Sequence, residues 1–406
     1  MVTQVNLALS KVLAQLSSGI RYVAFVFLVY HGWHSSIAVG AALGIPSFAQ
    51  LLFGPIGGLF ADRYHRPRYI ALMYLFQGLS VMGLFLLSEI RSFSVWALIS
   101  TIYVLFFVIN SVDVMVGPSY TTLITDMVDA KQLVRWQSAV GSLGQGAWIV
   151  GTVITGSLIQ YVGINPLLFV IVVLSVLSSL FILYVRESRQ RSVAVRTQQR
   201  RLGSAINLVS GFPEAWRALR SHPFLWAFMW VISITNIPHN ILLALPLFLS
   251  MDTNAGYTGF GIVEASLMIG TILGNLWFLR KNQTYRIRSL ISTAFIIQSI
   301  AIALLTFGTA QRWIVGVAIL MAVYGSTDSL FGPAYSYLSV SAPSSVRGQV
   351  LGLFNTISVL LNPVMSVFTG WVLTKLSTLE ILAALIVIFG LVSIFVRRLP
   401  ALDQSI

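Results

Sequence analysis

Residues 111–123 read SVDVMVGPSYTTL, and residues 326–338 read STDSLFGPAYSYL. The two segments lie 215 positions apart (326 − 111) in a chain of 406 residues, and six of their thirteen positions are identical. Each segment ends a long apolar run, and each carries an aspartate five residues before its proline, Asp113 in the first and Asp328 in the second. A repeat spaced at about half the chain predicts two related halves with a matched acid in each.

The composition of the chain restricts its class. The sequence is 57% hydrophobic and only 9% charged, with a mean hydropathy of +0.86. A soluble protein cannot bury that much apolar surface, so we expect lipid to be the solvent. The sequence has no cysteine, which excludes disulfides and thiol chemistry. It also shows no nucleotide-binding loop, Ser–His–Asp set or metal cluster. We therefore expect neither an enzyme nor a bound cofactor or metal.

Twelve apolar runs are long enough to cross about 30 Å of hydrocarbon as helices. We therefore predict an all-α membrane protein of two pseudo-symmetric six-helix bundles. The predicted bundles are residues 1–185 and 223–406, joined by a basic cytoplasmic linker, 186–222, that ends in an amphipathic surface helix. The predicted spans are 8–30, 37–61, 69–88, 93–117, 136–162, 165–185, 223–250, 256–279, 289–308, 313–333, 349–374 and 380–396.

The basic residues predict the orientation. With a cytoplasmic N-terminus, 21 of the 25 Lys and Arg residues fall in cytoplasmic segments. Three lie outside, Arg91, Arg312 and Lys375, and Arg21 lies within a span. This bias predicts that both termini are cytoplasmic. The net charge of +13 is then explained by topology and attraction to anionic lipid, and we expect no binding of nucleic acid.

A short loop between the second and third predicted spans carries a charged motif. Residues 58–68 read GLFADRYHRPR. The motif resembles the signature loop of the major facilitator superfamily, Gly-x-x-x-Asp-Arg/Lys-x-Gly-Arg/Lys-Arg/Lys, with His65 in place of glycine and Pro67 in place of a base. The matching positions are Gly58, Asp62, Arg63 and Arg66. The resemblance implies that this loop pairs with an acid on span 4, Asp113, and so latches the outward-open state.

Two further loops are similar to those of a narrower group. Residues 118–138 (PSYTTLITDMVDAKQLVRWQS) and 342–352 (APSSVRGQVLG) resemble loops of bacterial macrolide-efflux and siderophore-export proton antiporters, although Arg135-Trp-Gln replaces the usual Arg-Ala-Asn. This resemblance implies a monomer in the bacterial plasma membrane. It also implies proton-coupled export of amphipathic small molecules by alternating access. There are three alternatives to this function. The first two are a lipid or lysolipid flippase and a nutrient importer, which needs a more polar midplane. The third is a non-transporting membrane receptor.

Five ionisable residues are predicted to lie at bilayer depth, away from the ends of the spans, where each costs a few kcal/mol and therefore indicates a function. The superfamily fold lines its central cavity with spans 1, 4, 7 and 10, and all but Glu264 lie on those spans. Asp113 and Asp328 are placed about five residues from a cytoplasmic helix end, hence ~8 Å deep. That depth predicts latch pairs, Asp113 with Arg66 and Asp328 with Arg280 or Lys281, with a proton-carrier role as the alternative. The five residues are Arg21, Asp113, His239, Glu264 and Asp328.

The remaining candidates concern coupling and substrate. Arg21 and Glu264 are predicted to lie at similar depth, counted from opposite faces of the membrane. One hypothesis is therefore that they form an ion pair, which protonation of Glu264 releases. Glu264 could instead be satisfied locally, and Arg21 could bind an anionic group of the substrate. Pro238 is predicted to break span 7, with Asn236 and His239 satisfying the freed backbone groups. The alternative is that His239 relays protons or contacts the ligand. Four aromatic residues on cavity-type spans are predicted to form an apolar substrate wall: Tyr22, Phe25, Trp226 and Trp230.

Overall fold

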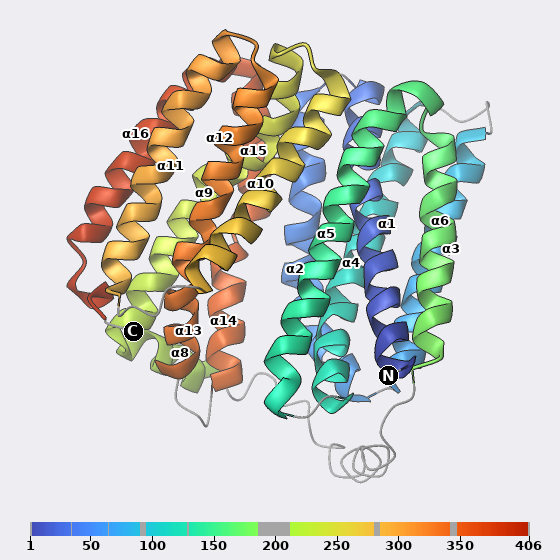
Figure 1. The fold of residues 1–406 in the computed structure, drawn as a ribbon, viewed down its shortest axis with the longest axis horizontal. Coiled ribbons are helices and arrows are strands. Elements are labelled where there is room, and N and C mark those ends of the chain that lie inside the picture. The colour runs from blue at the N-terminus through green and yellow to red at the C-terminus, as the bar shows by residue number, and fades with distance from the viewer. Residues whose placement is uncertain are drawn as a thin grey trace. The chain divides into compact units, whose positions relative to one another are not determined.

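The computed structural model describes residues 2–33, 35–63, 65–89, 95–127, 130–185, 212–279, 285–341 and 347–404. Every regular element in these ranges is a helix (Figure 1). The chain divides into two compact units, Met1–Ala205 and Ile206–Ile406. Their boundary falls inside the segment that the sequence predicts as a linker.

The described residues of the first unit form six long helices. The shortest has 19 residues and so extends about 28 Å, close to the hydrocarbon thickness of a bilayer. The helices are α1 (Val2–Trp33), α2 (Ser36–Arg63), α3 (Arg66–Glu89), α4 (Val95–Met127), α5 (Ala130–Val162) and α6 (Asn165–Leu183).

The second unit begins with a short helix and continues with six spans, of which two are interrupted. The short helix is α8 (Phe212–Ser221), where an amphipathic helix is predicted. The uninterrupted spans are α9 (Pro223–Asp252), α10 (Gly256–Leu279), α11 (Ile287–Ala310) and α16 (Thr378–Arg397). The interrupted spans are α12 (Ile314–Ser326), η2 (Thr327–Phe331) and α13 (Gly332–Ser341), and then α14 (Arg347–Val359) and α15 (Asn362–Lys375). A short η3 (Pro400–Leu402) follows α16.

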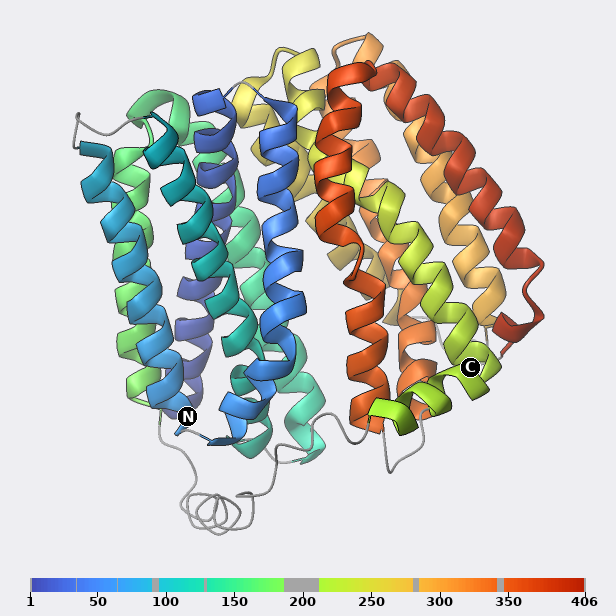
Figure 2. The ribbon, with the colours of Figure 1, turned by 180° about the vertical axis from the view of Figure 1, so that it is seen from behind.

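The pairing of helices repeats from one unit to the other. In the first unit α1 packs on α5, α2 on α4 and α3 on α6. In the second unit α9 packs on α14 and α15, α10 on α12, and α11 on α16 (Figure 2). In span numbers these are 1·5, 2·4 and 3·6, then 7·11, 8·10 and 9·12. The same three pairings in each half are what a duplicated six-helix bundle requires.

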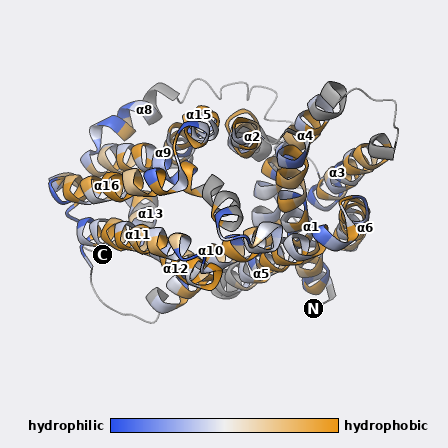
Figure 3. Ribbon diagram, turned by 90° about the horizontal axis from the view of Figure 1, so that it is seen from above, coloured by the Kyte–Doolittle hydropathy of each residue, from blue (hydrophilic) through white to orange (hydrophobic). Residues whose placement is uncertain are grey.

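The fold class predicted from the sequence is confirmed. Eleven helical stretches among the described residues are long and apolar enough to cross a membrane, and they coincide with predicted spans 1–6 and 8–12. The thirty-residue α9 coincides with span 7. Apolar residues cover these helices on the outside as well as between them, as the colouring of Figure 3 shows, because lipid leaves no reason for a polar outer face.

Small residues allow close helix crossings in the second unit. A Cβ added at Gly270 of α10 would lie 1.9 Å from the carbonyl oxygen of Ala322, and one at Gly325 of α12 would lie 2.0 Å from that of Leu267. No side chain fits at either position. Since helices in lipid associate by direct packing, these glycines fix the contact between α10 and α12.

The structure corrects the predicted effects of proline. Helix α4 runs through Pro118 to Met127, whereas the sequence analysis ended the span at residue 117. Helix α9 runs through Pro238 without the predicted break. The observed interruptions lie at η2 and at residues 360–361. A proline is tolerated in a packed bundle because neighbouring groups can satisfy the carbonyl that it leaves free.

Candidate translocation site

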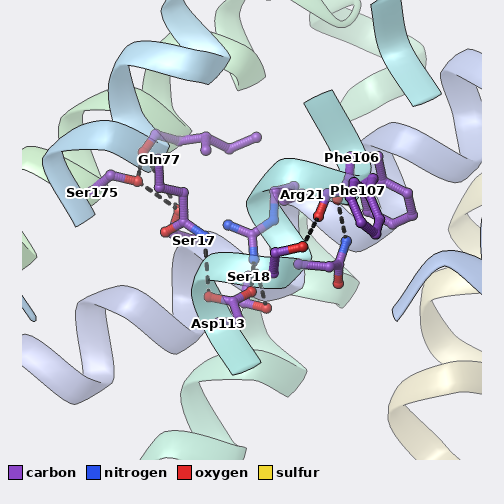
Figure 4. A network of polar contacts seen from close by, with 11 residues as sticks. Ser17, Ser18, Arg21, Gln77, Phe106, Phe107, Asp113 and Ser175 are labelled. Carbon is purple, nitrogen blue, oxygen red and sulfur yellow. Dashed lines mark hydrogen bonds and ion pairs between the residues drawn. The ribbon is translucent and has the colours of Figure 1, made fainter. Parts of the chain in front are cut away.

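An ion pair with a buried base and a partly exposed acid lies inside the first unit. Arg21 of α1 donates through Nη2 to Asp113 Oδ2 of α4 and to Ser18 Oγ at 3.3 Å. Gln77 of α3 donates through Nε2 to the second oxygen, Asp113 Oδ1, at 3.1 Å. Figure 4 shows Arg21 and Gln77 converging on the carboxylate, with Ser18 beside the guanidinium. Arg21 is 3% exposed and the Asp113 side chain 36%, so the acid faces accessible space and the base does not.

The depth of Asp113 explains this pairing and corrects the prediction. Asp113 lies 14 residues before the end of α4 (127 − 113), hence about 21 Å along the helix instead of the predicted 8 Å. Arg21 lies 19 residues after the start of α1 (21 − 2), about 28 Å along it. Both are therefore in the interior of the bundle. Reading α4 through Pro118 would have placed the two residues at similar depth.

A second polar layer lies beside the ion pair, and the sequence analysis missed it. Tyr120 of α4 shares a hydrogen bond of 2.6 Å with Ser10 Oγ, which also donates to the carbonyl of Ser178 at 2.8 Å. The Lys11 ammonium lies over the Tyr120 ring, 5.1 Å from its centroid. These contacts tie α1, α4 and α6 together. The only sign of these contacts in the sequence is Tyr120, the tyrosine that both copies of the repeat contain.

The second unit contains a cavity of about 240 Å³. Polar groups on one side face aromatic rings on the other. The polar lining is Thr235, Asn236, His239, Gln298, Tyr324 and Asp328, and the apolar lining includes Phe295, Phe331, Tyr335 and Phe389. Asp328 lies in η2, where the tenth span changes from α to 3-10 geometry. That interruption lies where the span lines a polar cavity, which is where irregular backbone is tolerated in membranes.

Hydrogen bonds hold the polar side of the cavity. Thr271 Oγ1 donates to Asp328 Oδ2 at 3.3 Å, and His239 Nδ1 lies 3.2 Å from the Tyr324 hydroxyl. Gln298 Nε2 donates to Thr327 Oγ1 at 2.8 Å. Its other end, Gln298 Oε1, is buried without a hydrogen-bond partner among the residues that the structure describes. An unsatisfied buried acceptor beside a cavity is suited to receive a donor from a solute.

The repeat shows how the two acids differ. The offset of 215 that relates Asp113 to Asp328 relates Arg21 to Asn236 (236 − 215 = 21). Asn236 is neutral, and its Nδ2 donates to the carbonyl of Ser358 at 2.6 Å, beside the interruption of the eleventh span. Within the described part of the chain, no lysine or arginine forms an ion pair with Asp328. His239 lines the same cavity as Asp328.

The predicted latch stays a prediction. Arg66 is buried, at 2% exposure, at the start of α3. The surroundings of Gly58 and the side chains of Asp62 and Arg63 are not among those described, and Arg280 and Lys281 lie outside the described residues. The ion pair that the structure shows at Asp113 is with Arg21, where the sequence analysis placed Arg66.

Glu264 is 2% exposed in α10, and no hydrogen bond or ion pair joins it to another described residue. It belongs to the second unit and Arg21 to the first, so their pairing remains a prediction.

The four aromatic residues predicted to form a substrate wall make packing contacts within their own units, and their contact with substrate stays a prediction. Phe25 is fully buried and stacks on Phe106 at 4.5 Å, and Tyr22 is tilted against Trp148 at 5.7 Å. Trp226 makes T-shaped contacts with Trp216 and Trp230, both at 5.7 Å, and neither Trp226 nor Trp230 is among the residues that line the cavity of the second unit. The sequence could not separate these rings because aromatic residues occur on every span.

A comparison with protein families places the chain. Its sequence matches the Major Facilitator Superfamily over residues 7–362. The chain belongs to the Major Facilitator Superfamily. This member has the expected superfamily architecture, a multi-pass membrane bundle. Membership of this superfamily indicates a transporter.

Solved structures of this superfamily share the fold. The nucleoside transporter NupG matches with a TM-score of 0.70 at 16% identity, covering 98% of each chain, and a mutant form of it with 0.73 at 14%, covering 99% of this chain and 100% of that one. The xylose transporter XylE from E. coli, in an inward-open conformation, matches with 0.67 at 14%, covering 100% and 95%. No curated protein matches the sequence. The narrower resemblance to macrolide-efflux and siderophore-export proteins gains no support from these similarities.

Proposed function

We propose that this superfamily member is a proton-coupled secondary transporter of a small polar solute, and that Asp328 is its proton-binding group. The observation that carries the proposal is the different surroundings of the two repeated acids. Asp113 is neutralised by Arg21. Asp328 lines a cavity, with a threonine hydroxyl as its hydrogen-bond donor. An intramembrane acid without a permanent counter-charge is the group that a proton can neutralise.

The cavity supports a small and polar substrate. Its volume of about 240 Å³ is below the roughly 300–1,000 Å³ of pockets for drug-sized ligands. The lining offers amide, hydroxyl, imidazole and carboxylate groups opposite aromatic rings. The midplane is therefore more polar than the sequence analysis expected of this chain, which favours the importer alternative. The structurally similar proteins are named as nucleoside and xylose transporters, and one as a D-xylose-proton symporter. Such hydroxyl-rich solutes suit these groups.

Export of an amphipathic molecule is the second candidate. The rings of Phe295, Phe331 and Phe389 give the cavity one apolar wall, which an amphipathic solute could contact. We further propose that the protein works as a monomer in the bacterial plasma membrane with both termini in the cytoplasm, as the positions of the basic residues indicate.

The test uses purified protein in liposomes with an imposed pH gradient. Nucleosides, pentoses, hexoses, cationic dyes and macrolides are offered as substrates, and transport is measured in both directions. We expect a polar solute to accumulate in response to the gradient. Asp328→Asn should reduce gradient-driven accumulation at least tenfold while retaining substrate exchange, because the cavity keeps its shape. Accumulation by Asp328→Asn at the parent level would refute the assignment of the proton site.

A second variant uses the repeat itself. Asn236→Arg places an arginine where the first half has Arg21, and it should also abolish coupling by neutralising Asp328. Asn236→Gln is the matched control, since it keeps the amide, and we expect it to transport. Glu264→Gln tests the competing hypothesis that protonation of Glu264 couples proton entry to transport. If only Glu264→Gln loses coupling, the proton-binding group is Glu264.

A further inference from the structure

The outer face of the second unit has a groove between α11 and α16, which lie side by side (Figures 1 and 2). The groove has a volume of about 290 Å³ and lies apart from the cavity that contains Asp328. Its walls are Ile296, Ser299, Ile300, Gly390, Ser393 and Ile394, and Arg397 closes one end. Ile300 and Ile394 are more than half exposed.

The serines of the groove do not make it polar. Ser299 donates to the carbonyl of Ile386 at 2.9 Å. Ser393 donates to the carbonyl of Ser292 at 3.0 Å, and its hydroxyl lies 2.9 Å from that of Ser292. Because these hydroxyls are satisfied within the helix pair, the remaining wall is apolar. Gly390 leaves the middle of the groove open, since a Cβ there would touch only Ser299 Oγ, at 3.8 Å.

Arg397 is held in a fixed orientation at the end of the groove. Its Nε donates to Ser292 Oγ at 2.8 Å. Within the described ranges, no acceptor contacts its two Nη atoms, and the side chain is exposed. A guanidinium fixed through Nε presents the two Nη groups as a fork that matches the oxygens of a phosphate.

Further positive charge surrounds this end of the helix pair. Arg286 and Arg288 lie at the start of α11, and Arg398 follows Arg397 at the end of α16. One acid, Asp403, meets Arg288 at 3.0 Å and Arg286 at 3.8 Å. Four arginines against one aspartate leave an excess of positive charge, which complements an anionic headgroup.

The dimensions match one leaflet of a bilayer. From Arg397 to Gly390 is seven residues of α16, or about 10 Å of groove. Half of the hydrocarbon core is about 15 Å thick. A headgroup at Arg397 would therefore place an acyl chain along the apolar wall at its natural depth.

We propose that the groove between α11 and α16 is a binding site for an anionic phospholipid, with its phosphate on Arg397 and one acyl chain against Gly390. The lipid belongs to the leaflet on the side of the chain's termini. It binds helices of one unit only, so the site exists whatever solute the protein carries.

Native mass spectrometry of the full-length protein in detergent tests the site. The protein is titrated with phosphatidylglycerol, with phosphatidylcholine of the same chains, and with glycerol phosphate, which has no acyl chain. We expect phosphatidylglycerol to bind at least fivefold more tightly than the other two. Arg397→Gln should weaken its binding about fivefold, the effect of one arginine near an anionic surface.

Two matched pairs of variants separate the site from general effects. Gly390→Phe fills the groove and should prevent binding, whereas Leu391→Phe adds the same ring at an exposed neighbouring position and should not. Lys375→Gln removes one charge from a different helix and should leave binding unchanged. Equal binding of the two lipids, or unchanged phosphatidylglycerol binding by Arg397→Gln or Gly390→Phe, would overturn the proposal. Binding of glycerol phosphate as tight as that of the lipid would also overturn it.

Discussion

Arg21 and Asp113 form a pair of unequal burial, and this determines which partner matters more for stability. Arg21 is 3% exposed and the Asp113 side chain 36%. Removing the acid leaves a charged guanidinium buried without a counter-ion. Removing the base leaves a carboxylate that is still partly exposed and still accepts a hydrogen bond from Gln77. The two substitutions should therefore differ in cost.

We predict that Asp113→Asn lowers the free energy of unfolding by about 3 kcal/mol and Arg21→Gln by only about 1 kcal/mol, since the exposed partner is screened. The double variant should cost less than the sum, because no unpaired charge remains. Denaturant unfolding in detergent measures all three. Equal costs for the two single variants would show that burial does not govern the pair.

The sequence predicted some of the functional residues, but it predicted their positions in the bundle less well. The repeat located Asp113, Asp328 and their equivalence without any structure. It did not reveal that Asp113 pairs with Arg21, because a proline was taken as a helix end and the depth was underestimated. The cavity also escaped prediction, because Gln298 and Tyr324 carry no charge that would mark them against an apolar background.

At the scale of elements, hydropathy located the spans but not their interruptions. Every span must be long enough to cross the bilayer, so the length of an apolar run identifies a span. The interruptions at η2 and at residues 360–361 depend on side chains of other helices, such as Asn236 donating to Ser358. Such partners are distant in sequence. For the same reason Pro118 and Pro238 remain within helices.

The contact between α10 and α12 yields a prediction in which the sign of the effect depends on packing. Alanine is intrinsically better than glycine in a helix by about 1 kcal/mol. At Gly352 of α14 nothing lies within 4 Å of an added Cβ, so Gly352→Ala should be neutral or slightly stabilising. At Gly270 the added Cβ would lie 1.9 Å from a backbone oxygen of α12.

Gly270→Ala should therefore destabilise the protein by about 1–3 kcal/mol, as overpacking does. Thermal unfolding of both alanine variants beside the parent is the measurement. If Gly270→Ala were as stable as Gly352→Ala, the close approach of α10 and α12 would not be needed for the fold.

At the scale of the whole molecule, the two units contain the same pairings of helices but different charges. The first unit keeps its acid neutralised inside the bundle, and the second keeps its acid on a cavity wall. A duplicated scaffold allows this, because the packing of helices depends on small and apolar residues at their contacts. The polar residues of each half are then free to diverge.

The absence of cysteine makes the orientation of this scaffold directly testable. Ser221 at the end of α8 is exposed and adjoins the linker that carries much of the positive charge, and Gln311 is exposed in the turn after α11. The positive-inside rule places Ser221 in the cytoplasm and Gln311 outside. A membrane-impermeant maleimide applied to intact cells should label Gln311→Cys and not Ser221→Cys. After permeabilisation both should react, which shows that each cysteine is accessible. Labelling of Ser221→Cys in intact cells would reverse the orientation and move the arginine-rich end of α16 to the outer leaflet.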